Sequence, residues 1–166
     1  MTPEDLDQTD RLLLMYLQQD GRISNQELAQ RVDLSPSPCL RRVKRLEEQG
    51  YIRRYVALVE PARLGLGLLA YISVRLDKSQ RAEHSAITGF AQDVQGWPEV
   101  TQCYAMSGDM DYLLRVQVSD LSAFSRFAMD ILMRHPAVVD IRSSFALRSI
   151  KETTELPVAL TDEPLM

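Results

Sequence analysis

Apolar residues recur at helical spacing three times within the first fifty residues. The first stretch runs from about Leu6 to Gln19, and Asp7 stands where a capping residue is expected. Its inward face consists of Leu13, Tyr16 and Leu17. Two shorter stretches follow almost without interruption. The pattern therefore predicts a bundle of three short helices that ends before Gly50.

The second and third helices each begin with a start signal. Ser24 is followed by Glu27, a spacing at which the serine accepts a backbone N–H and the glutamate reaches back to the serine's own N–H. Ser35 is a capping residue before Pro36, and proline at the first helical position lacks an N–H that would have no partner there. Three residues separate the helices, and the middle one, Asp33, tolerates a left-handed backbone. Such a tight turn predicts a helix-turn-helix.

The second half of the chain changes its period. The order of elements is strand, helix, strand, strand, helix, strand. Strands are expected at about 70–76, 100–106, 112–118 and 139–147, and helices at about 86–94 and 121–132. This order predicts a ferredoxin-like βαββαβ domain, in which two helices cover one face of an antiparallel sheet. The open face has apolar residues that favour dimerisation, namely Tyr71, Tyr104 and Met106.

The fold class is therefore α+β. A helix-turn-helix (winged-helix-like) domain is expected at 1–50, a linker strand and hinge at 51–65, a ferredoxin-like domain at 66–156 and a flexible tail at 157–166. The inward positions expected on the second helix of the ferredoxin-like domain are Leu121, Phe124, Ala128, Ile131 and Leu132. Those expected on one face of its last strand are Val139, Ile141, Phe145 and Leu147, with Ser143 among them.

The third helix separates an apolar face from a basic one. The apolar positions, expected to pack inward, are Cys39, Leu40, Val43 and Leu46. The opposite side holds Ser37, Arg41, Lys44 and Arg45, with Arg42 on the flank. An arginine fork binds phosphate or the O6/N7 edge of guanine. A solvated charged face is the commoner reason for such a pattern, but the capped helices and the short turn favour a helix that recognises DNA.

Basic residues are concentrated here although the whole chain is acidic. The formal net charge is −4, whereas residues 41–54 contain six Arg or Lys against two Glu. An acidic remainder repels DNA and confines binding to this face. Arg53 and Arg54 are candidates for phosphate contacts, and exposed charges leading into a strand are an equally simple interpretation.

The remaining composition is that of an ordinary soluble globular protein. No apolar run approaches the roughly 20 residues that a membrane-spanning helix needs, and the acidic N-terminus is unlike a secretory signal. Cys39 and Cys103 lack metal-ligand spacing, and nothing supports a disulfide between them. A reducing cytoplasm fits these features.

The segment Ser107–Tyr112, with the sequence SGDMDY, lies between two predicted strands. Gly108 offers the backbone freedom of a hairpin turn, and turn formation is a sufficient reason for its presence. A metal site at Asp109 and Asp111 lacks further ligands. A turn with free N–H groups beside carboxylates also suits a zwitterion, because N–H groups bind an α-carboxylate and Asp binds an α-ammonium.

Three segments together resemble the Lrp/AsnC family of leucine-responsive and asparagine-responsive regulators. They are LSPSPCLRRVKRLEEQGYI, SGDMDYLLRVQVSDLSAF and SSFALRSIKETTELP, and the resemblance covers about Leu6 to Pro157. It implies a DNA-binding transcriptional regulator whose ferredoxin-like domain binds an amino acid and forms dimers that assemble to tetramers or octamers. The implied partners are double-stranded DNA and a free amino acid. The implied location of the protein is the cytoplasm, in association with the nucleoid. No enzymatic activity, metal, other cofactor or membrane is implied.

The residues and the resemblance together assign two sites. The recognition helix is 36–49, and the DNA-binding residues are Ser35, Ser37, Arg41, Arg42, Lys44, Arg45, Arg53 and Arg54. The resemblance places an effector pocket between dimers, with Ser107, Gly108, Asp109, Met110, Asp111 and Tyr112 from the turn. Further candidates, with a neighbouring subunit contributing, are Ser143, Ser144 and Phe145. The first and third segments look more like the leucine-responsive branch, which favours leucine, methionine or another apolar amino acid.

Two functions of other classes stay open. Cys39 lies near a helix N-terminus, where thiolates are favoured, so a redox-sensing regulator is an alternative, although the apolar face favours packing. Ferredoxin-like folds also host enzymes. Against an enzyme, His84 and His135 have no nucleophile–base pair or metal set around them in the sequence.

Overall fold

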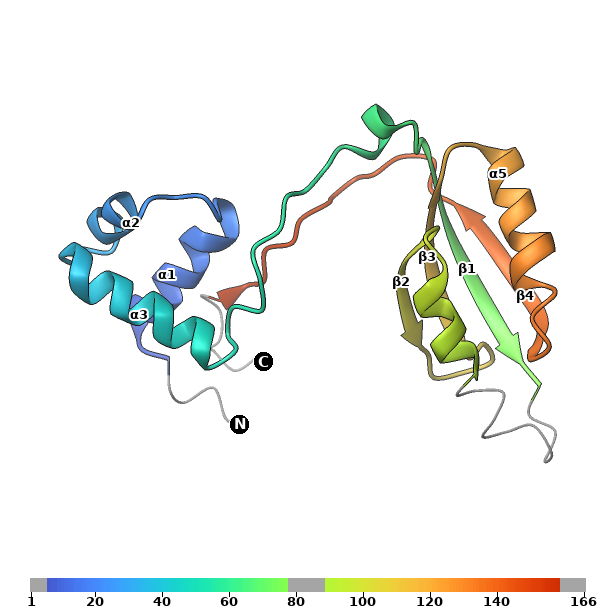
Figure 1. Cartoon of the computed structure of the whole chain (residues 1–166), viewed down its shortest axis with the longest axis horizontal. Helices are drawn as coiled ribbons and strands as arrows, with labels where there is room; N and C mark the ends of the chain where they lie inside the picture. Colours follow the sequence, from blue (N-terminus) through green and yellow to red (C-terminus); the bar gives the residue numbers. More distant parts are fainter. Residues whose placement is uncertain (1–5, 78–88, 159–166) are drawn as a thin grey trace. The chain divides into compact units, whose positions relative to one another are not determined.

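The computed structural model describes residues 6–77 and 89–158, and the chain divides into two units (Figure 1). Among the described residues, one unit comprises 6–58 together with 151–158, and the other comprises 59–77 and 89–150. Each unit has its own hydrophobic core. No helix in these ranges is both long and apolar enough to cross a membrane.

The first unit contains the three predicted helices, α1 (Gln8–Gln19), α2 (Asn25–Arg31) and α3 (Pro36–Glu48). Asp7 caps α1 as predicted, because its carboxylate accepts the N–H of Asp10 at 2.8 Å. The turn between α2 and α3 depends on Asp33, whose φ of 55° confirms the left-handed backbone. The core of the unit consists of Leu13, Leu28, Ala29, Val32, Cys39 and Leu46.

The two serine start signals are only partly realised. Ser24 Oγ accepts the N–H of Glu27 at 3.1 Å, but the Glu27 carboxylate bonds Arg31 at 2.6 Å, so the reciprocal half of that capping box was predicted wrongly. Ser35 occupies the N-cap of α3 without a side-chain capping bond. The reason lies in the sequence: Pro38 at the third helical position has no N–H to donate.

The second unit has a four-stranded antiparallel sheet. Its strands are β1 (Leu68–Leu76), β2 (Val100–Ala105), β3 (Tyr112–Val118) and β4 (Val138–Phe145), in the order β2-β3-β1-β4. Residues 89–93 are helical and continue into η3 (Val94–Gly96), and the second helical segment is α5 (Leu121–Arg126) with η4 (Phe127–Leu132). The predicted ferredoxin-like arrangement is confirmed. Ala86 and Ile87, placed in the first helix by the sequence pattern, lie outside the described residues.

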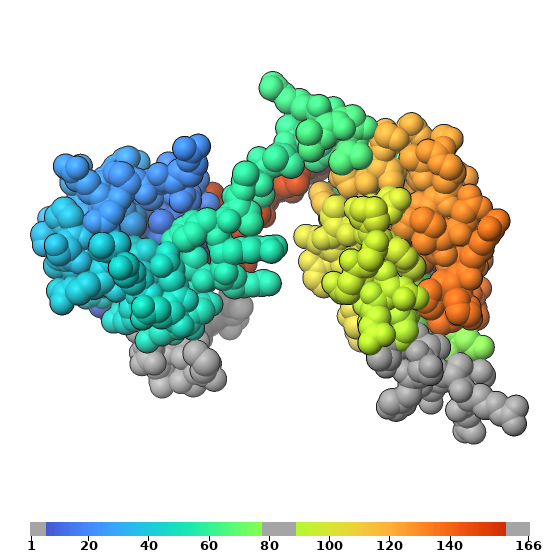
Figure 2. All heavy atoms as spheres, viewed as in Figure 1, coloured from blue at the N-terminus to red at the C-terminus, as the bar shows by residue number. Residues whose placement is uncertain are grey.

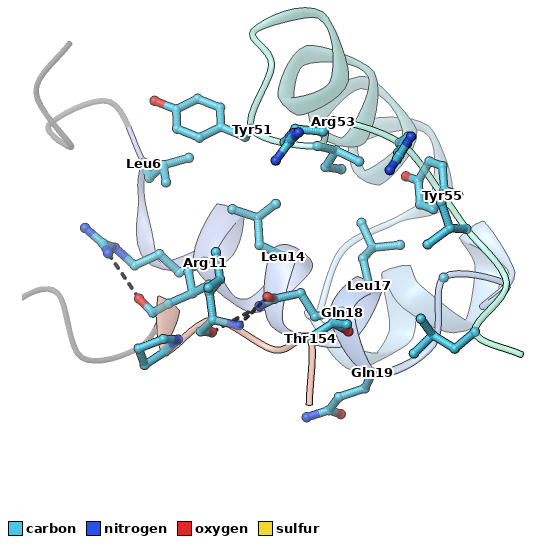
Figure 3. A pocket seen from close by; sticks show the side chains of 18 residues that line it. Leu6, Arg11, Leu14, Leu17, Gln18, Gln19, Tyr51, Arg53, Tyr55 and Thr154 are labelled. Atoms are coloured by element: carbon cyan, nitrogen blue, oxygen red, sulfur yellow. Dashed lines mark hydrogen bonds between the residues drawn. The ribbon is translucent and has the colours of Figure 1, made fainter. Parts of the chain in front are cut away.

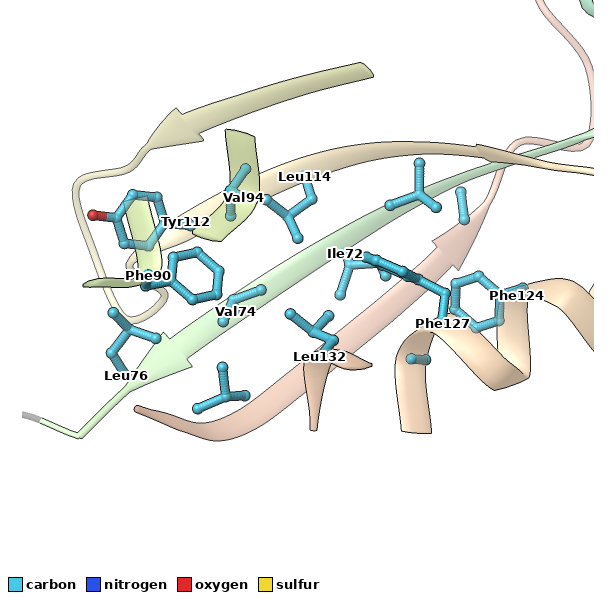
Figure 4. Close-up of a cluster of buried hydrophobic side chains, with 14 of the residues drawn as sticks. Ile72, Val74, Leu76, Phe90, Val94, Tyr112, Leu114, Phe124, Phe127 and Leu132 are labelled. Atoms are coloured by element: carbon cyan, nitrogen blue, oxygen red, sulfur yellow. The ribbon is translucent and has the colours of Figure 1, made fainter. Parts of the chain in front are cut away.

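The two helical segments share one core on the sheet. Figure 4 shows Phe90, Phe127 and Leu132 packed toward Ile72, Val74 and Leu114, all of them nearly inaccessible to solvent. In Figure 2 the segment around residue 90 lies against the segment 121–137. Their contacts include the rings of Phe90 and His135, 5.2 Å between centroids, and those of Trp97 and Phe127, 5.7 Å.

The second helix differs from the prediction in its second half. From Phe127 it continues as a π-helix, whose i→i+5 hydrogen bonds change which residues face the sheet. Phe127, three residues after the buried Phe124, is itself buried although it was not predicted to be. Leu121 is 62% exposed and Ile131 is 38% exposed, so their predicted inward positions were wrong.

The last strand also departs from a simple alternation. The pairing of β1 with β4 shifts register between Arg75 and Leu76, which indicates a β-bulge. Because of this shift Val138 is buried and Val139 is 50% exposed, so the predicted inward position of Val139 was wrong. Leu147 lies beyond the strand and is 98% exposed, which corrects its prediction too.

The segments that follow α3 and β4 were expected to be a linker strand and the end of the second domain. Residues 53–60 are exposed and have no strand partner in the described chain, and the short helix η2 (Pro61–Leu64) follows. Of the described residues after β4, 151–158 group with the helix-turn-helix unit. The Gln18 side chain exchanges hydrogen bonds with the backbone of Leu156 at 2.6 and 3.2 Å, and Arg11 donates to the Val158 carbonyl at 3.2 Å (Figure 3).

Between this C-terminal segment and α1 lies a largely apolar cavity of about 790 Å³. Figure 3 shows Leu6, Leu14, Leu17 and Tyr51 directed toward it. Pairing of the C-terminal segment with α1 depends on bonds between residues about 140 positions apart, which explains why a local hydrophobic pattern did not predict it.

Candidate functional site

The outward face of α3 is polar and basic, as predicted. Ser35, Ser37, Arg41 and Lys44 are exposed, whereas Cys39 and Leu46 are fully buried and Val43 is half-buried. Leu40 was predicted to face inward but is 43% exposed. It lies in the same i, i+4 row as Pro36 and Lys44, which face outward.

Two of the predicted DNA-binding arginines are engaged by α1. Arg42 Nη1 lies 2.9 Å from Asp10 Oδ1 and 2.6 Å from Asp7 Oδ2, and Arg45 Nη2 donates to Asp10 Oδ2. The Asp10 residue is 0% exposed. No role was predicted for Asp10 from the sequence. The available signal was its helical phase, since Asp10 lies in register with Leu13 and Leu17 on the inward side of α1.

The ion pair of Asp7 with Arg42 shifts the pKa values of these two groups. Partial burial raises the pKa of Asp7, but the N–H of Asp10 and the guanidinium of Arg42 outweigh it and hold that pKa below its ordinary value. The hydrogen bonds to Asp7 and Asp10 raise the pKa of Arg42 further. Both groups therefore stay charged throughout the neutral range.

The arginines of α3 also border a small hollow. A depression of about 350 Å³ is lined by Leu34, Pro38, Arg41, Arg42 and Arg45. Three guanidinium groups around one hollow suit an anion such as a phosphate. Arg53 and Arg54, the remaining predicted contacts, are exposed and border the cavity beside the C-terminal segment instead (Figure 3).

The turn Ser107–Asp111 joins β2 and β3, and Gly108 has a φ of 112°, which L side chains rarely adopt. The turn is closed by the N–H of Met106, which donates to the Asp111 carbonyl at 2.8 Å. Within the described residues, the backbone N–H groups of 107–110 have no hydrogen-bond acceptor. The turn thus presents several free donors on an exposed loop.

The two aspartates of the turn differ in their surroundings. Asp111 Oδ2 accepts the N–H of Leu76 at 2.8 Å, and the Asp111 N–H donates to the Val74 carbonyl at 2.8 Å, so this residue fastens the turn to β1. Asp109 is exposed. The carboxylate that is available to a bound ammonium group is therefore that of Asp109. No cluster of metal-ligating side chains occurs in the ranges 6–77 and 89–158.

Of the other predicted effector residues, Tyr112 directly follows Asp111, whereas the three on β4 lie apart from the turn within one chain. Tyr112 is only 9% exposed and packs on Phe90, with 4.9 Å between ring centroids; its hydroxyl points away from the cluster in Figure 4. Burial raises its pKa, with further contributions from Cys103 and Asp111. Ser143, Ser144 and Phe145 lie on β4, two strands away from β3, and pair with Ile72, Tyr71 and Ala70 near the opposite end of β1.

The features that would support other functions have structural roles. Cys39 is 0% exposed and its burial raises the pKa of the thiol, which opposes the reactive thiolate of a redox sensor. His135 lies 3.1 Å from Asp93 Oδ2 through Nε2, and its Nδ1 accepts the N–H of Ala137. Both ring nitrogens of this histidine thus hold the helical segments and the start of β4 together. His84 lies outside the described residues.

Comparisons with known proteins identify the families of both halves of the chain. Residues 6–53 match the winged helix-turn-helix DNA-binding family, and residues 69–156 match the Lrp/AsnC ligand binding domain. The leucine-responsive regulatory proteins of Klebsiella pneumoniae and Escherichia coli strain K12 are each 42% identical over 155 residues, which is 93% of this chain and 93% of theirs.

Solved structures give the same result. A transcriptional regulator from Neisseria meningitidis in complex with L-Met has a TM-score of 0.87 and 48% identity, covering 92% of this chain and 97% of that one. An AsnC family transcriptional regulator from Agrobacterium tumefaciens has a TM-score of 0.85 and 38% identity, covering 93% and 98%. These relatives are regulators and not enzymes, and the chain belongs to the Lrp/AsnC family of DNA-binding transcriptional regulators.

Proposed function

We propose that this regulator senses an apolar amino acid, leucine or methionine, at the turn 107–112 and changes its DNA affinity in response. The observation that carries the proposal is the turn itself, with free N–H groups, a left-handed Gly108 and the exposed Asp109. The N–H groups suit the α-carboxylate of an amino acid, and Asp109 suits its α-ammonium. The complex of the Neisseria relative with L-Met supports methionine in particular.

The DNA contacts are assigned to the outward face of α3. Ser35 and Ser37 stand at the start of the helix with free hydroxyls, since the Ser35 side chain forms no cap. Arg41 and Lys44 follow one and two turns later on the same side. Arg53 and Arg54 contact flanking phosphates, while Arg42 and Arg45 act from their positions beside Asp10. Base edges are read near the start of the helix and phosphates along its length.

The working form is an oligomer of this chain. The segment 53–59 exposes Tyr55, Val56, Leu58 and Val59, and its backbone has no hydrogen-bond partner within the described chain. An extended segment of this kind pairs with a second copy. On the sheet, Tyr71 and Tyr104 lie on the face opposite the helices and are 37% and 53% exposed. A second copy that covers this face gives a dimer.

Dimers associate further, to tetramers or octamers, and the amino acid binds where dimers meet. This arrangement accounts for the separation of Ser143, Ser144 and Phe145 from the turn of the same chain, because a neighbouring subunit supplies them. The amino acid shifts the equilibrium between assemblies only if it binds one assembly better than another. A changed assembly respaces paired α3 helices, and with them the DNA half-sites that they fit. The oligomer acts on the nucleoid.

Substitution of Tyr104 by aspartate is expected to weaken the dimer at least tenfold, because a charge would be buried where an aromatic ring packs. Analytical ultracentrifugation measures the effect: the variant dimer dissociates into monomers at protein concentrations at which the wild-type dimer remains associated. Leu121→Asp is the matched control, since Leu121 is 62% exposed on the helical side of the sheet. Equal sedimentation of Tyr104→Asp and wild-type protein would show that the open face is not the interface.

Isothermal titration calorimetry of the full chain tests the effector assignment. L-Leu and L-Met are expected to bind, and L-Asp is expected not to bind beside the carboxylate of Asp109. The apolar side chains of leucine and methionine bury surface at a contact between dimers, so the measured heat capacity change on binding is negative. Absence of binding by either apolar amino acid at millimolar concentration would refute the proposed effector class.

A further inference from the structure

Asp10 is a buried charge that faces the recognition helix from α1. Within the described ranges, Asp10 is the one polar residue that is fully buried, with 0% exposure. A buried carboxylate is expensive unless it is paired. Here each oxygen has an arginine, Arg42 on Oδ1 at 2.9 Å and Arg45 on Oδ2, and the N–H of Asp7 lies 3.4 Å from Oδ2 as well.

The pairing divides the basic residues of α3 into two groups. Arg42 and Arg45 face the carboxylates of Asp7 and Asp10, so two positive charges meet two negative ones. Arg41 and Lys44 are exposed and have no acidic partner among the residues that the structure describes. The uncompensated charge of the helix is therefore concentrated on its outward row.

The arginine side chains remain partly accessible at the same time. The Arg42 side chain is 31% exposed and that of Arg45 is 44% exposed, and both border the hollow that Arg41 shares. Without a counter-charge from α1, these two guanidinium groups would be free to move toward DNA phosphates. Non-specific affinity for DNA rises with the number of phosphates that a protein neutralises.

We propose that Asp10 is a specificity-determining positioning residue: it holds Arg42 and Arg45 against α1 and so leaves most of the phosphate contact of α3 to Arg41 and Lys44. Non-specific binding is thereby kept weak, and discrimination is left to the outward row near the helix start. This inference rests on the proposed contact of α3 with DNA. It assigns Asp10 a role in binding, whereas a purely structural ion pair would affect folding stability only.

The test uses the full chain with Asp10→Asn, which keeps the size and an acceptor oxygen but removes the charge. Fluorescence anisotropy on a duplex of unrelated sequence, between 50 and 200 mM salt, gives the slope of log affinity against log salt. Because each phosphate neutralised contributes roughly 0.9 to that slope, the released arginines are expected to steepen it by about 0.9 to 1.8. The same relation predicts non-specific binding roughly eightfold tighter for each phosphate gained at about 0.1 M salt.

Asp7→Asn is the matched control, since Asp7 pairs only with Arg42 and its side chain is 52% exposed. It is expected to change the slope less than Asp10→Asn does. An unchanged or shallower slope for a folded Asp10→Asn variant would overturn the role of Asp10. Circular dichroism decides whether the variant is folded.

A second pair of variants keeps the proposal testable if Asp10→Asn does not fold. Arg41→Gln is expected to lower the salt slope by about 0.9, and Arg45→Gln by less than half as much, because Asp10 already holds Arg45. Equal losses for the two variants would contradict the inference. If wild-type protein binds no duplex at all, the proposed function of α3 fails instead, so the two failures are distinguishable.

Discussion

Substitution of Arg41 by alanine is expected to weaken binding to the DNA upstream of the protein's own gene by about 10- to 100-fold at physiological salt. A single well-placed arginine contact contributes roughly 1–3 kcal/mol to discrimination, or about 5- to 150-fold in affinity, and the expected loss lies within that range. Arg41 is exposed on α3 and lacks an acidic partner within the described chain, so its guanidinium is available to DNA. Fluorescence anisotropy with a labelled duplex measures the change.

Arg63→Ala is the matched control, because it removes the same charge from an exposed residue in η2, outside the helix-turn-helix unit. Its expected effect is less than threefold. Arg41→Lys adds a further distinction: lysine preserves the charge but not the bidentate fork. Wild-type affinity in the folded Arg41→Ala variant would show that the outward row of α3 is not the DNA-contacting surface.

Substitution of Gly108 by alanine is expected to weaken amino-acid binding about tenfold or more and to leave effector-free DNA binding unchanged. At a φ of 112° the backbone of any residue with a Cβ is strained, which costs about 1–3 kcal/mol. No atom lies within 4 Å of the added Cβ, so the strain comes from the backbone conformation and not from a clash. The turn then leaves its native conformation for most of the time, and the apparent affinity falls in proportion. Calorimetric titration with L-Met measures the loss.

The control for this substitution is Gly96→Ala. An added Cβ at Gly96 also meets nothing within 4 Å, and Gly96 does not have a positive φ, so the change tests the loss of glycine without the backbone strain. Its amino-acid affinity is expected to stay within about twofold of wild type. Full affinity for L-Met in a folded Gly108→Ala variant would place the effector elsewhere in the unit.

The fold was predictable from the sequence because its periodic signals are local. The strand predicted at 112–118 is β3, in which alternate residues, Leu114, Val116 and Val118 among them, lie in the core. Two of the errors, at Ile131 and Val139, occur where the period itself changes. The π-helix from Phe127 and the bulge beside Leu76 each shift the pattern of buried positions by about one residue. A prediction that assumes a regular helix or strand does not anticipate such a shift.

The candidate sites were predictable to a lesser degree. Exposure of Ser37, Arg41 and Lys44 follows from the helical wheel of α3. Arg42 and Arg45 pair with Asp10 because α1 packs against α3, and the paired residues are more than thirty positions apart in the sequence. The helical wheel of a single helix therefore cannot predict this pairing. In the turn, sequence identified the glycine but did not separate the fastened Asp111 from the exposed Asp109, because the distinction arises from the neighbouring strand β1.

The central claim is that an apolar amino acid at the turn 107–112 controls binding of α3 to DNA. The most direct measurement is fluorescence anisotropy on the protein's own upstream DNA, scanned against the twenty amino acids, with sedimentation under the same conditions. Leucine or methionine is expected to shift DNA affinity by about 5- to 150-fold and to change the oligomer distribution, and Gly108→Ala is expected to remove both responses. DNA affinity and sedimentation that do not respond to any amino acid, or a full response in Gly108→Ala, would contradict the claim.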